Sequence, residues 1–227
     1  MKKIALIFVI LSFFSVLAFA EGKANHQVFV GFQYRWENFE TEMFKDYFVK
    51  LKDGEAKIKD VFDTSGAITV GLATFNRSAV VGLYNSIAVT IPYYTTINNV
   101  IEYTEQEMIN IKDHLGEAKF YGMGVDWIIG PGFNFMDLGL VKIPVVIGGH
   151  VYGDIDWTSG ESPAFKLVGG IGGNIGVEVH LFGLNVFAQC QFAYDFYGMV
   201  WAPNNTFSHG KAGVFSLMPQ IGIGLKF

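Results

Sequence analysis

Hydrophobic and polar residues alternate along most of the chain. Near the N-terminus, Val28 and Val30 fall on one face of such a segment, while Gln33 and Arg35 fall on the other. Successive side chains of a β-strand point to opposite faces, so a period of two predicts strands with one apolar and one polar face. The pattern predicts eight strands, at about residues 27–36, 67–75, 79–91, 118–129, 140–153, 165–181, 184–197 and 214–227.

The predicted connections alternate in length. Those after the second, fourth and sixth strands are short, whereas the others are long and cover residues 37–65, 92–117, 154–164 and 198–213. An up-and-down meander places all short turns at one end and all long loops at the other. The sequence therefore predicts an all-β fold, an eight-stranded antiparallel up-and-down transmembrane β-barrel with short periplasmic turns and longer extracellular loops.

Alternation alone leaves open which face points outward. A soluble barrel of the lipocalin kind would turn its apolar face inward, whereas a membrane barrel turns it to lipid. The glycine-rich polar faces suit a narrow, packed interior, and several segments are long enough to cross a bilayer on a tilt. Aromatic residues at the ends of the apolar faces resemble an interfacial girdle: Trp36, Trp127, Phe165, Tyr194, Phe196 and Phe227. These features favour the membrane barrel.

Two loops and two strands depart from this simple pattern. Apolar residues at helical spacing predict short helices near residues 43–51 and 100–115. Pro144 and Pro219 fall within predicted strands, where a proline removes one hydrogen-bond donor. They predict either bulges or different strand limits.

Composition narrows the class of protein. Hydrophobic residues make up 51% of the chain and charged residues 16%, with 27 Gly and 22 Phe. The net charge of −5 and the lack of a basic block argue against a nucleic-acid partner. A single cysteine, Cys190, rules out an internal disulfide framework and a thiolate-rich zinc site. No cofactor is predicted.

The N-terminus has the form of an export signal. Lys2 and Lys3 precede an apolar stretch at residues 4–17, and Ala18-Phe19-Ala20 forms a small-x-small cleavage site. This predicts a signal peptide at residues 1–20, removed on export, and an outer-membrane barrel domain at residues 21–227.

Two segments carry a resemblance to known proteins. The ending Ile221-Gly-Ile-Gly-Leu-Lys-Phe227 looks like the terminal strand of bacterial outer-membrane barrels, and residues 120–127 (FYGMGVDW) are similar to a glycine-alternating strand of the OmpW/OprG family. The resemblance implies that the assembly machinery reads Phe227. It also implies that a break in the wall near Pro92, Tyr93 and Tyr94 could release an apolar molecule sideways into lipid. The alternative is that Pro92 simply ends a strand.

The polar faces supply the candidate site residues. They could set the selectivity of a channel, or pair with one another and fill a narrow barrel. The lumen-facing candidates are Arg35, Lys142, His150, Glu178, Gln189 and Asp195. The histidines lack metal-site spacing, and no aligned His-Asp-Ser set supports a hydrolase, so no enzyme is predicted. The glycine-rich run at residues 169–176 fails the spacing of a nucleotide loop and is interpreted as a strand.

Three functions remain open from the sequence. The first is passive passage of small, hydrophobic molecules across the bacterial outer membrane. The second is a structural or adhesin-type barrel that presents its surface loops. The third is a secreted soluble lipid-binding barrel. In the first two cases the lipid bilayer is the main partner.

Overall fold

The computed structural model describes residues 24–39, 48–51, 54–76, 81–102, 108–110, 120–158, 164–181, 184–201 and 207–226. The predicted signal peptide and Phe227 lie outside these ranges. The described strands are β1 (Ala24–Phe39), β2 (Phe48–Leu51), β3 (Gly54–Asn76), β4 (Val81–Glu102), β5 (Met108–Asn110), β6 (Phe120–Asp137), β7 (Val141–Thr158), β8 (Ala164–Leu181), β9 (Leu184–Trp201) and β10 (Phe207–Lys226). Among the described residues, no helix is long and apolar enough to cross a membrane.

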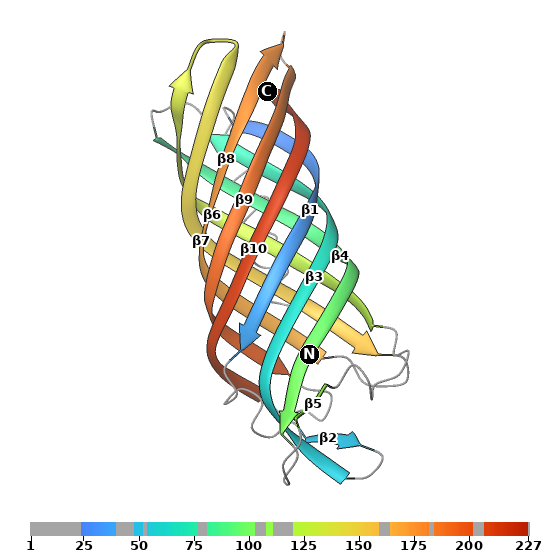
Figure 1. The fold of residues 1–227 in the computed structure, drawn as a ribbon. Helices are drawn as coiled ribbons and strands as arrows, with labels where there is room; N and C mark the ends of the chain where they lie inside the picture. The colour runs from blue at the N-terminus through green and yellow to red at the C-terminus, as the bar shows by residue number, and fades with distance from the viewer. Residues whose placement is uncertain are drawn as a thin grey trace.

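Eight of the strands close into a ring (Figure 1). Each pairs antiparallel with its neighbours in the order β1-β3-β4-β6-β7-β8-β9-β10, and β10 pairs back onto β1 from Asn25↔Lys226 to Phe39↔Ala212. The predicted eight-stranded antiparallel up-and-down barrel is therefore confirmed. The strand ends Asn76, Asp137 and Leu181 lie at one end of the ring, here called the turn end, and the opposite end is called the loop end.

Most strands of the ring are longer than the alternation predicted. β6 runs on to Asp137 instead of ending at about residue 129, and β10 begins at Phe207 instead of at about residue 214. The largest extensions are those of β3 and β4. β3 begins at Gly54 and β4 continues to Glu102, and the two pair with each other over this additional length. Phe48–Leu51 and Met108–Asn110 add to their edges as β2 and β5. The helices predicted for these loops are therefore wrong where the chain is described. Polar residues such as Asp60 and Asn98 interrupt the alternation here, so the period of two could not reveal the strands.

Three prolines interrupt hydrogen-bonded ladders without ending a strand. Pro144 lies in β7 and Pro219 in β10, and at each of them two consecutive pairs with one neighbouring strand are missing while the register is kept. The same gap occurs beside Pro131 between β6 and β7. A proline has no N–H to donate, which accounts for these gaps. A bulge between Asn134 and Met136 lies opposite Pro144.

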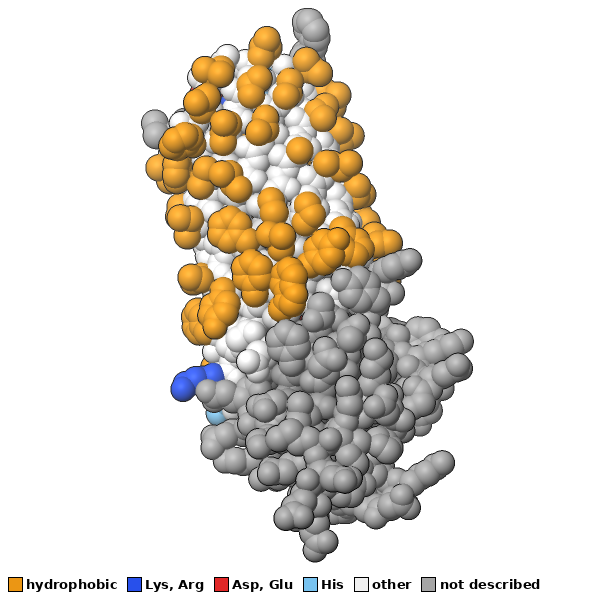
Figure 2. Space-filling model, in the orientation of Figure 1, with side chains coloured by type: hydrophobic (Ala, Val, Ile, Leu, Met, Phe, Trp, Pro, Cys, Tyr) orange, Lys and Arg blue, Asp and Glu red, His pale blue; other side chains and the backbone are white. Residues whose placement is uncertain are grey.

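The apolar faces of the strands form the outside of the ring. Ile147, Ile171 and Ile221 each expose about 60% of their surface, and Figure 2 shows hydrophobic side chains over most of the coloured part of the molecule. The polar faces point inward. Because the soluble lipid-binding alternative requires the apolar face inside, this arrangement does not fit it.

Gly139 allows the tight turn between β6 and β7. Between β6 and β7, Gly139 adopts a positive φ of 79°, which glycine tolerates better than other residues. The carboxylate of Asp137 accepts a hydrogen bond from the Gly139 N–H at 3.0 Å, and its other oxygen lies 2.6 Å from Lys142 Nζ. These two contacts hold the pKa of the Asp137 carboxyl below its usual value, with the Lys142 hydrogen bond as the largest cause.

Candidate functional site: the barrel lumen

Polar side chains from all eight strands of the ring are buried inside the barrel. They include Gln27, Gln33, Arg35, Glu37, Thr69, Thr90, Asp126, His150, Asp154, Asn174, Glu178, Gln189, Gln191, Asp195 and Gln220. Buried polar groups are costly unless they are hydrogen-bonded. Their contacts therefore indicate whether the lumen is an open channel or is filled by paired side chains.

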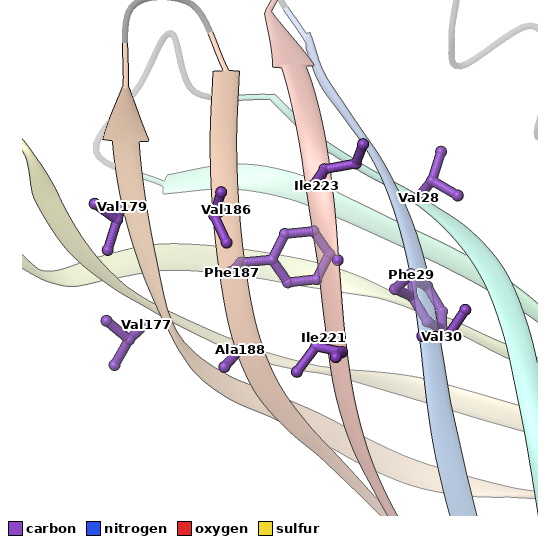
Figure 3. Close-up of a pocket in the computed structure, with 11 residues that line it drawn as sticks. Val28, Phe29, Val30, Val177, Val179, Val186, Phe187, Ala188, Ile221 and Ile223 are labelled. Atoms are coloured by element: carbon purple, nitrogen blue, oxygen red, sulfur yellow. The ribbon is translucent and has the colours of Figure 1, made fainter.

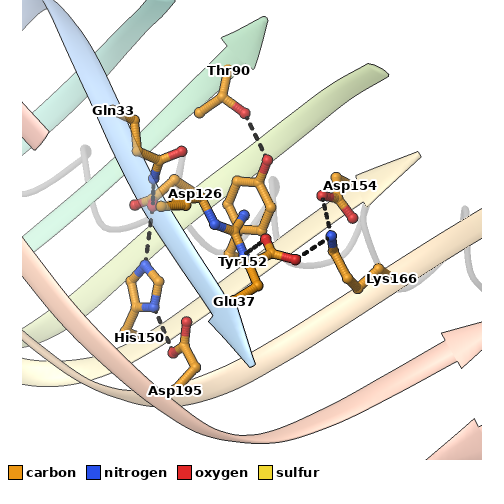
Figure 4. A network of polar contacts seen from close by, with 10 residues as sticks. Gln33, Glu37, Thr90, Asp126, His150, Tyr152, Asp154, Lys166 and Asp195 are labelled. Atoms are coloured by element: carbon orange, nitrogen blue, oxygen red, sulfur yellow. Dashed lines mark hydrogen bonds and ion pairs between the residues drawn. The ribbon is translucent and has the colours of Figure 1, made fainter. Parts of the chain in front are cut away.

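An ion network occupies the loop-end half of the lumen (Figure 4). Glu37 bridges two cations, with Arg35 Nη2 at 2.9 Å from one carboxylate oxygen and Lys166 Nζ at 2.7 Å from the other. Lys166 also lies 3.2 Å from a carboxylate oxygen of Asp154. These contacts join strands β1, β7 and β8 across the barrel interior.

His150 sits between two carboxylates in the same half. Its Nδ1 lies 2.7 Å from Asp195 Oδ1 and its Nε2 lies 3.0 Å from Asp126 Oδ2. The side-chain amides of Gln33 and Gln191 donate to Asp126 as well, at 2.7 and 2.6 Å. A carboxylate only accepts hydrogen bonds, so both ring nitrogens donate when the imidazole is a cation.

Tyr152 crosses the lumen beside this network. Its ring lies under the guanidinium of Arg35, with 3.3 Å between the guanidinium carbon and the ring centroid. Its hydroxyl is 3.2 Å from the Thr90 hydroxyl. A Cβ at Gly124 would meet the Tyr152 hydroxyl at 2.3 Å, so the missing side chain of this glycine makes room for the tyrosine.

An apolar layer lies nearer the turn end. Its members are Phe29, Ala73, Phe75, Tyr84, Ala88, Ile128, Val146, Phe187 and Met218. Its phenylalanines lie against glycines. A Cβ at Gly71 would meet the Phe29 ring at 2.2 Å, and one at Gly222 would meet the Phe187 ring at 2.5 Å. The inward glycines thus let aromatic rings fill the narrow interior.

Amide and hydroxyl groups complete the filling at the turn end. The Asn174 amide donates to the Tyr84 hydroxyl at 3.0 Å. The Gln27 amide donates to the Glu178 carboxylate at 2.7 Å, and the Gln189 amide donates to Gln220 at 2.8 Å. Polar and apolar side chains therefore share the turn-end half of the interior, where Asn174 and Gln189 both contact the Tyr84 hydroxyl.

The structure separates the six candidates taken from the sequence into three places. Arg35, His150 and Asp195 lie in the loop-end network, and Glu178 and Gln189 lie in the turn-end half of the lumen. Lys142 is 21% exposed at the turn, where it pairs with Asp137. Sequence reasoning missed Tyr152. Its position two residues after His150, on the same face of β7, was the available signal.

The ladder between β4 and β6 ends before either strand does. Between β4 and β6, the paired residues end at Thr90↔Gly124. Both strands go on beyond this point, β4 paired with β3 and β6 paired with β7. Among the described residues, this leaves a seam between β4 and β6 in the loop-end half of the wall.

Pro92 lies two residues beyond Thr90, the last residue of β4 that pairs with β6. The strand does not end there, because β4 continues past it to Glu102. Pro92 faces Ala67 and Tyr94 faces Gly66, so Tyr93 is an extra residue that forms a bulge against β3. The side chains of residues 92–94 lie outside the described part of the chain.

The lumen contacts do not assemble a recognisable catalytic set in the described residues. A serine-hydrolase triad needs one histidine nitrogen on a hydroxyl nucleophile, whereas both nitrogens of His150 contact carboxylates. No group of three or more His, Cys, Asp or Glu side chains among the described residues is arranged to hold a metal ion.

The outer surface carries a shallow apolar groove over β8, β9, β10 and β1 (Figure 3). It encloses about 640 Å³. Val177, Ala188 and Ile221 lie along one side of it and Val179, Val186 and Ile223 along the other, with the Phe187 ring between the two rows. An outer groove lined by aliphatic side chains suits contact with lipid chains.

A closed antiparallel barrel with an apolar exterior and a polar, packed interior is the arrangement of transmembrane β-barrels. This chain has that arrangement. No family model and no curated protein matches it.

Solved structures of similar fold are bacterial surface and outer-membrane proteins. Neisserial surface protein A has 12% sequence identity over 89% of this chain and 97% of its own, with a TM-score of 0.45. The outer membrane protein OprG from Pseudomonas aeruginosa has 12% identity over 91% and 97%, with a TM-score of 0.44. Ail, the attachment invasion locus protein of Yersinia pestis, has 10% identity over 90% and 99%, with a TM-score of 0.42. At these identities the likeness concerns the fold.

Proposed function

We propose that this protein is an outer-membrane barrel that gives small apolar molecules a passive route into the lipid. The observation that carries the proposal is the seam between β4 and β6 beyond Thr90↔Gly124. A molecule that enters at the loop end would leave through this seam, sideways, rather than through the turn end.

The filled interior favours a sideways exit. Below the seam, Tyr152 and the ion network occupy the lumen, and the apolar layer around Phe29 and Phe187 follows. An eight-stranded barrel leaves room inside for little beyond side chains. The residues on each side of the seam, Ile91 and Met123, point outward and are 58% and 49% exposed, which suits an apolar exit.

Bridging the seam tests this route. Ile91 and Met123 would be the next pair after Thr90↔Gly124, so we replace both with cysteine in a Cys190→Ala background and join them with a short, reductant-cleavable thiol cross-linker. Uptake of a small apolar tracer into liposomes should fall to the protein-free level and return on reduction. Uptake that stays unchanged in the bridged protein would rule out this exit.

A matched control pair lies two residues away in the same strands. Val89 and Val125 already face each other in the ladder. The Val89→Cys/Val125→Cys protein, bridged in the same way, should transport as well as its reduced form because the bridge adds no closure there. A loss of uptake in this control would show that any bridge in the wall impairs the barrel.

Export and assembly form part of the same proposal. Residues 1–20 would direct secretion and be removed, and Phe227 would be read by the outer-membrane assembly machinery. Removal of Phe227 should lower the amount of protein found in the outer-membrane fraction without changing the amount synthesised. Equal amounts in that fraction would argue against recognition of this residue.

A filled barrel that displays its loops is the second candidate. It is favoured by the paired extension of β3 and β4, with β2 and β5 at its edges, which reaches beyond the ring at the loop end (Figure 1). In the liposome assay, wild-type uptake no higher than in protein-free vesicles would favour this display function over transport.

A further inference from the structure

Exposed aromatic side chains continue along the outer face of β9 and β10 toward the loop end. Tyr194 and Phe196 are 50% and 53% exposed on β9. Trp201 ends the same strand, and Phe207, which begins β10 opposite Trp201, is 44% exposed. The outer surface is therefore aromatic from the lipid-facing wall to the far end of both strands.

Four ring side chains near this end form one connected row. Trp201 packs on Phe207 with 4.4 Å between ring centroids, and the Phe207 ring lies 5.7 Å from the His209 ring. The His209 ring in turn lies 6.2 Å from the Tyr197 ring. We call Trp201, Phe207, His209 and Tyr197 the aromatic row. These contacts limit the rotamers of the four side chains, so they lose little entropy when a ligand binds.

The end of the row nearest the wall is polar. The Tyr197 hydroxyl lies 3.1 Å from His209 Nδ1, and both side chains are exposed. When this hydroxyl donates to Nδ1, the proton of the His209 ring is on Nε2 and is available to a ligand. The Tyr197 oxygen keeps lone pairs that accept hydrogen bonds. The row thus combines apolar ring surface with hydrogen-bonding groups at one end.

The aromatic row extends beyond the apolar height of the wall. The part of β9 from Leu184 to Tyr194 is about ten residues long, which on a tilted strand spans the roughly 25 Å apolar height of membrane barrels. Trp201 is about seven residues further along, which at a tilt of about 45° is roughly 15 Å along the membrane normal. The headgroup layer adds only about 5–8 Å on each side. The outer end of the row therefore lies beyond the headgroups of the leaflet on the loop side.

We propose that the aromatic row binds the sugar part of a glycolipid in the leaflet on the loop side. The C–H groups on the face of a sugar ring carry partial positive charge, and the face of an aromatic ring is negative, so the two faces stack. Trp201 and Phe207 supply the aromatic faces. Sugar hydroxyls both donate and accept hydrogen bonds, so they fit the groups of His209 and Tyr197 at the polar end.

The position of the row favours a glycolipid over a free sugar or a plain lipid. Exposed Tyr194 and Phe196 connect the row to the lipid-facing wall, so lipid chains that lie on the wall bring their sugars to the row. The headgroup of a lipid without sugars ends below the outer part of the row. The site rests on the membrane embedding proposed above, but it does not depend on transport.

Native mass spectrometry of the intact barrel tests the site. The protein is released from nanodiscs of phosphatidylcholine that contain either rough lipopolysaccharide, which carries core sugars, or lipid A alone. The wild type should retain the lipopolysaccharide preferentially. Phe207→Leu removes one ring but keeps apolar bulk, and it should weaken this retention about fivefold. Trp201→Leu/Phe207→Leu should weaken it further, while retention of lipid A stays the same in all three proteins.

Phe192→Leu is the matched control. Phe192 is 42% exposed on β9, nearly the same as Phe207, but it lies in the lipid-facing wall and should leave retention unchanged. Equal retention of the two lipids by the wild type would overturn the proposal, as would equal retention of lipopolysaccharide by the wild type and the double variant. If free core oligosaccharide displaces the lipid at comparable concentration, the site is for free sugar and the glycolipid assignment is wrong. Boiled and unboiled gels of each variant report folding separately, so failure of membrane embedding is distinguished from failure of this site.

Discussion

At the scale of single residues, the lumen combines charge pairing with close packing. His150, Asp126 and Asp195 come from β7, β6 and β9, and their contacts of 2.7 and 3.0 Å hold three strands at fixed distances. A buried charge is tolerated only when its partners are present. The burial of the two carboxylates therefore depends on contact with His150, and the burial of His150 depends on contact with them.

Replacement of His150 tests this dependence. His150→Leu leaves Asp126 and Asp195 buried without their shared partner, and it should lower the free energy of unfolding by about 3–5 kcal/mol. Urea unfolding in lipid vesicles measures the change. The triple variant Asp126→Asn/His150→Leu/Asp195→Asn removes the charges together and should recover most of the loss. If the single variant is as stable as the wild type, the three groups do not act as one unit.

The lumen network was only partly predictable from the sequence. Successive side chains of a strand point to opposite faces, and this alternation placed Arg35, His150 and Asp195 on polar faces. It could not show that His150 contacts Asp126, since that contact depends on the register between β6 and β7. Nor could it identify Tyr152 as a lumen residue that crosses to Arg35, because tyrosine fits an aromatic girdle equally well.

At the scale of elements, the sequence predicted the strands that touch lipid and missed the parts that extend beyond it. Alternation follows from having lipid on one side and a packed lumen on the other. Where β3 and β4 leave the ring, neither condition holds and the pattern disappears. The strand ends before the short connections after β3 and β8 were predicted closely, but β6 was predicted to end at about residue 129 and runs on to Asp137. The turn therefore lies at Gly139, whose positive φ required the structure.

The β6–β7 turn gives a prediction at this scale. Gly139 has no neighbouring atom within 4 Å of a built Cβ, so Gly139→Ala meets no clash and its cost comes from the backbone alone. Alanine at φ 79° should lower the free energy of unfolding by about 1 kcal/mol. Gly149→Ala is the control, because Gly149 also has open space but lies in a strand without positive φ. A loss of similar size in both variants would contradict a conformational cause.

At the scale of the whole molecule, the outer surface defines a band for the bilayer. Val177 pairs with Ala188, which lies between Leu184 at the turn end and the exposed aromatic residue Tyr194 nearer the loop end. The intervening strand is about ten residues long, which on a tilted strand matches the roughly 25 Å apolar height of membrane barrels. Val177 is therefore placed near the middle of the membrane.

A charge at that depth should be costly. Val177→Arg, or Ile143→Arg at the same level of β7, should lower the free energy of unfolding in lipid vesicles by about 2–4 kcal/mol. Ile171→Arg is the control, because Ile171 pairs with the exposed Tyr194 nearer the loop end. This substitution should cost about 0–1 kcal/mol. Equal costs at the two depths would show that the band is wrongly placed.

The final prediction concerns which end of the barrel faces the cell exterior. β1 begins and β10 ends at the turn end, where Asn25 pairs with Lys226, so both described ends of the barrel lie on that side. If short turns face the periplasm, as in other outer-membrane barrels, the loop end is outside. In a Cys190→Ala background, cysteine at Gly54 or Asn205 should then react with a membrane-impermeant maleimide on intact cells, whereas cysteine at Arg77 should react only after the outer membrane is permeabilised. Labelling of the Arg77 position on intact cells, with protection of Gly54 and Asn205, would show that the barrel is inserted with its turns outside. The seam would then lie in the inner leaflet.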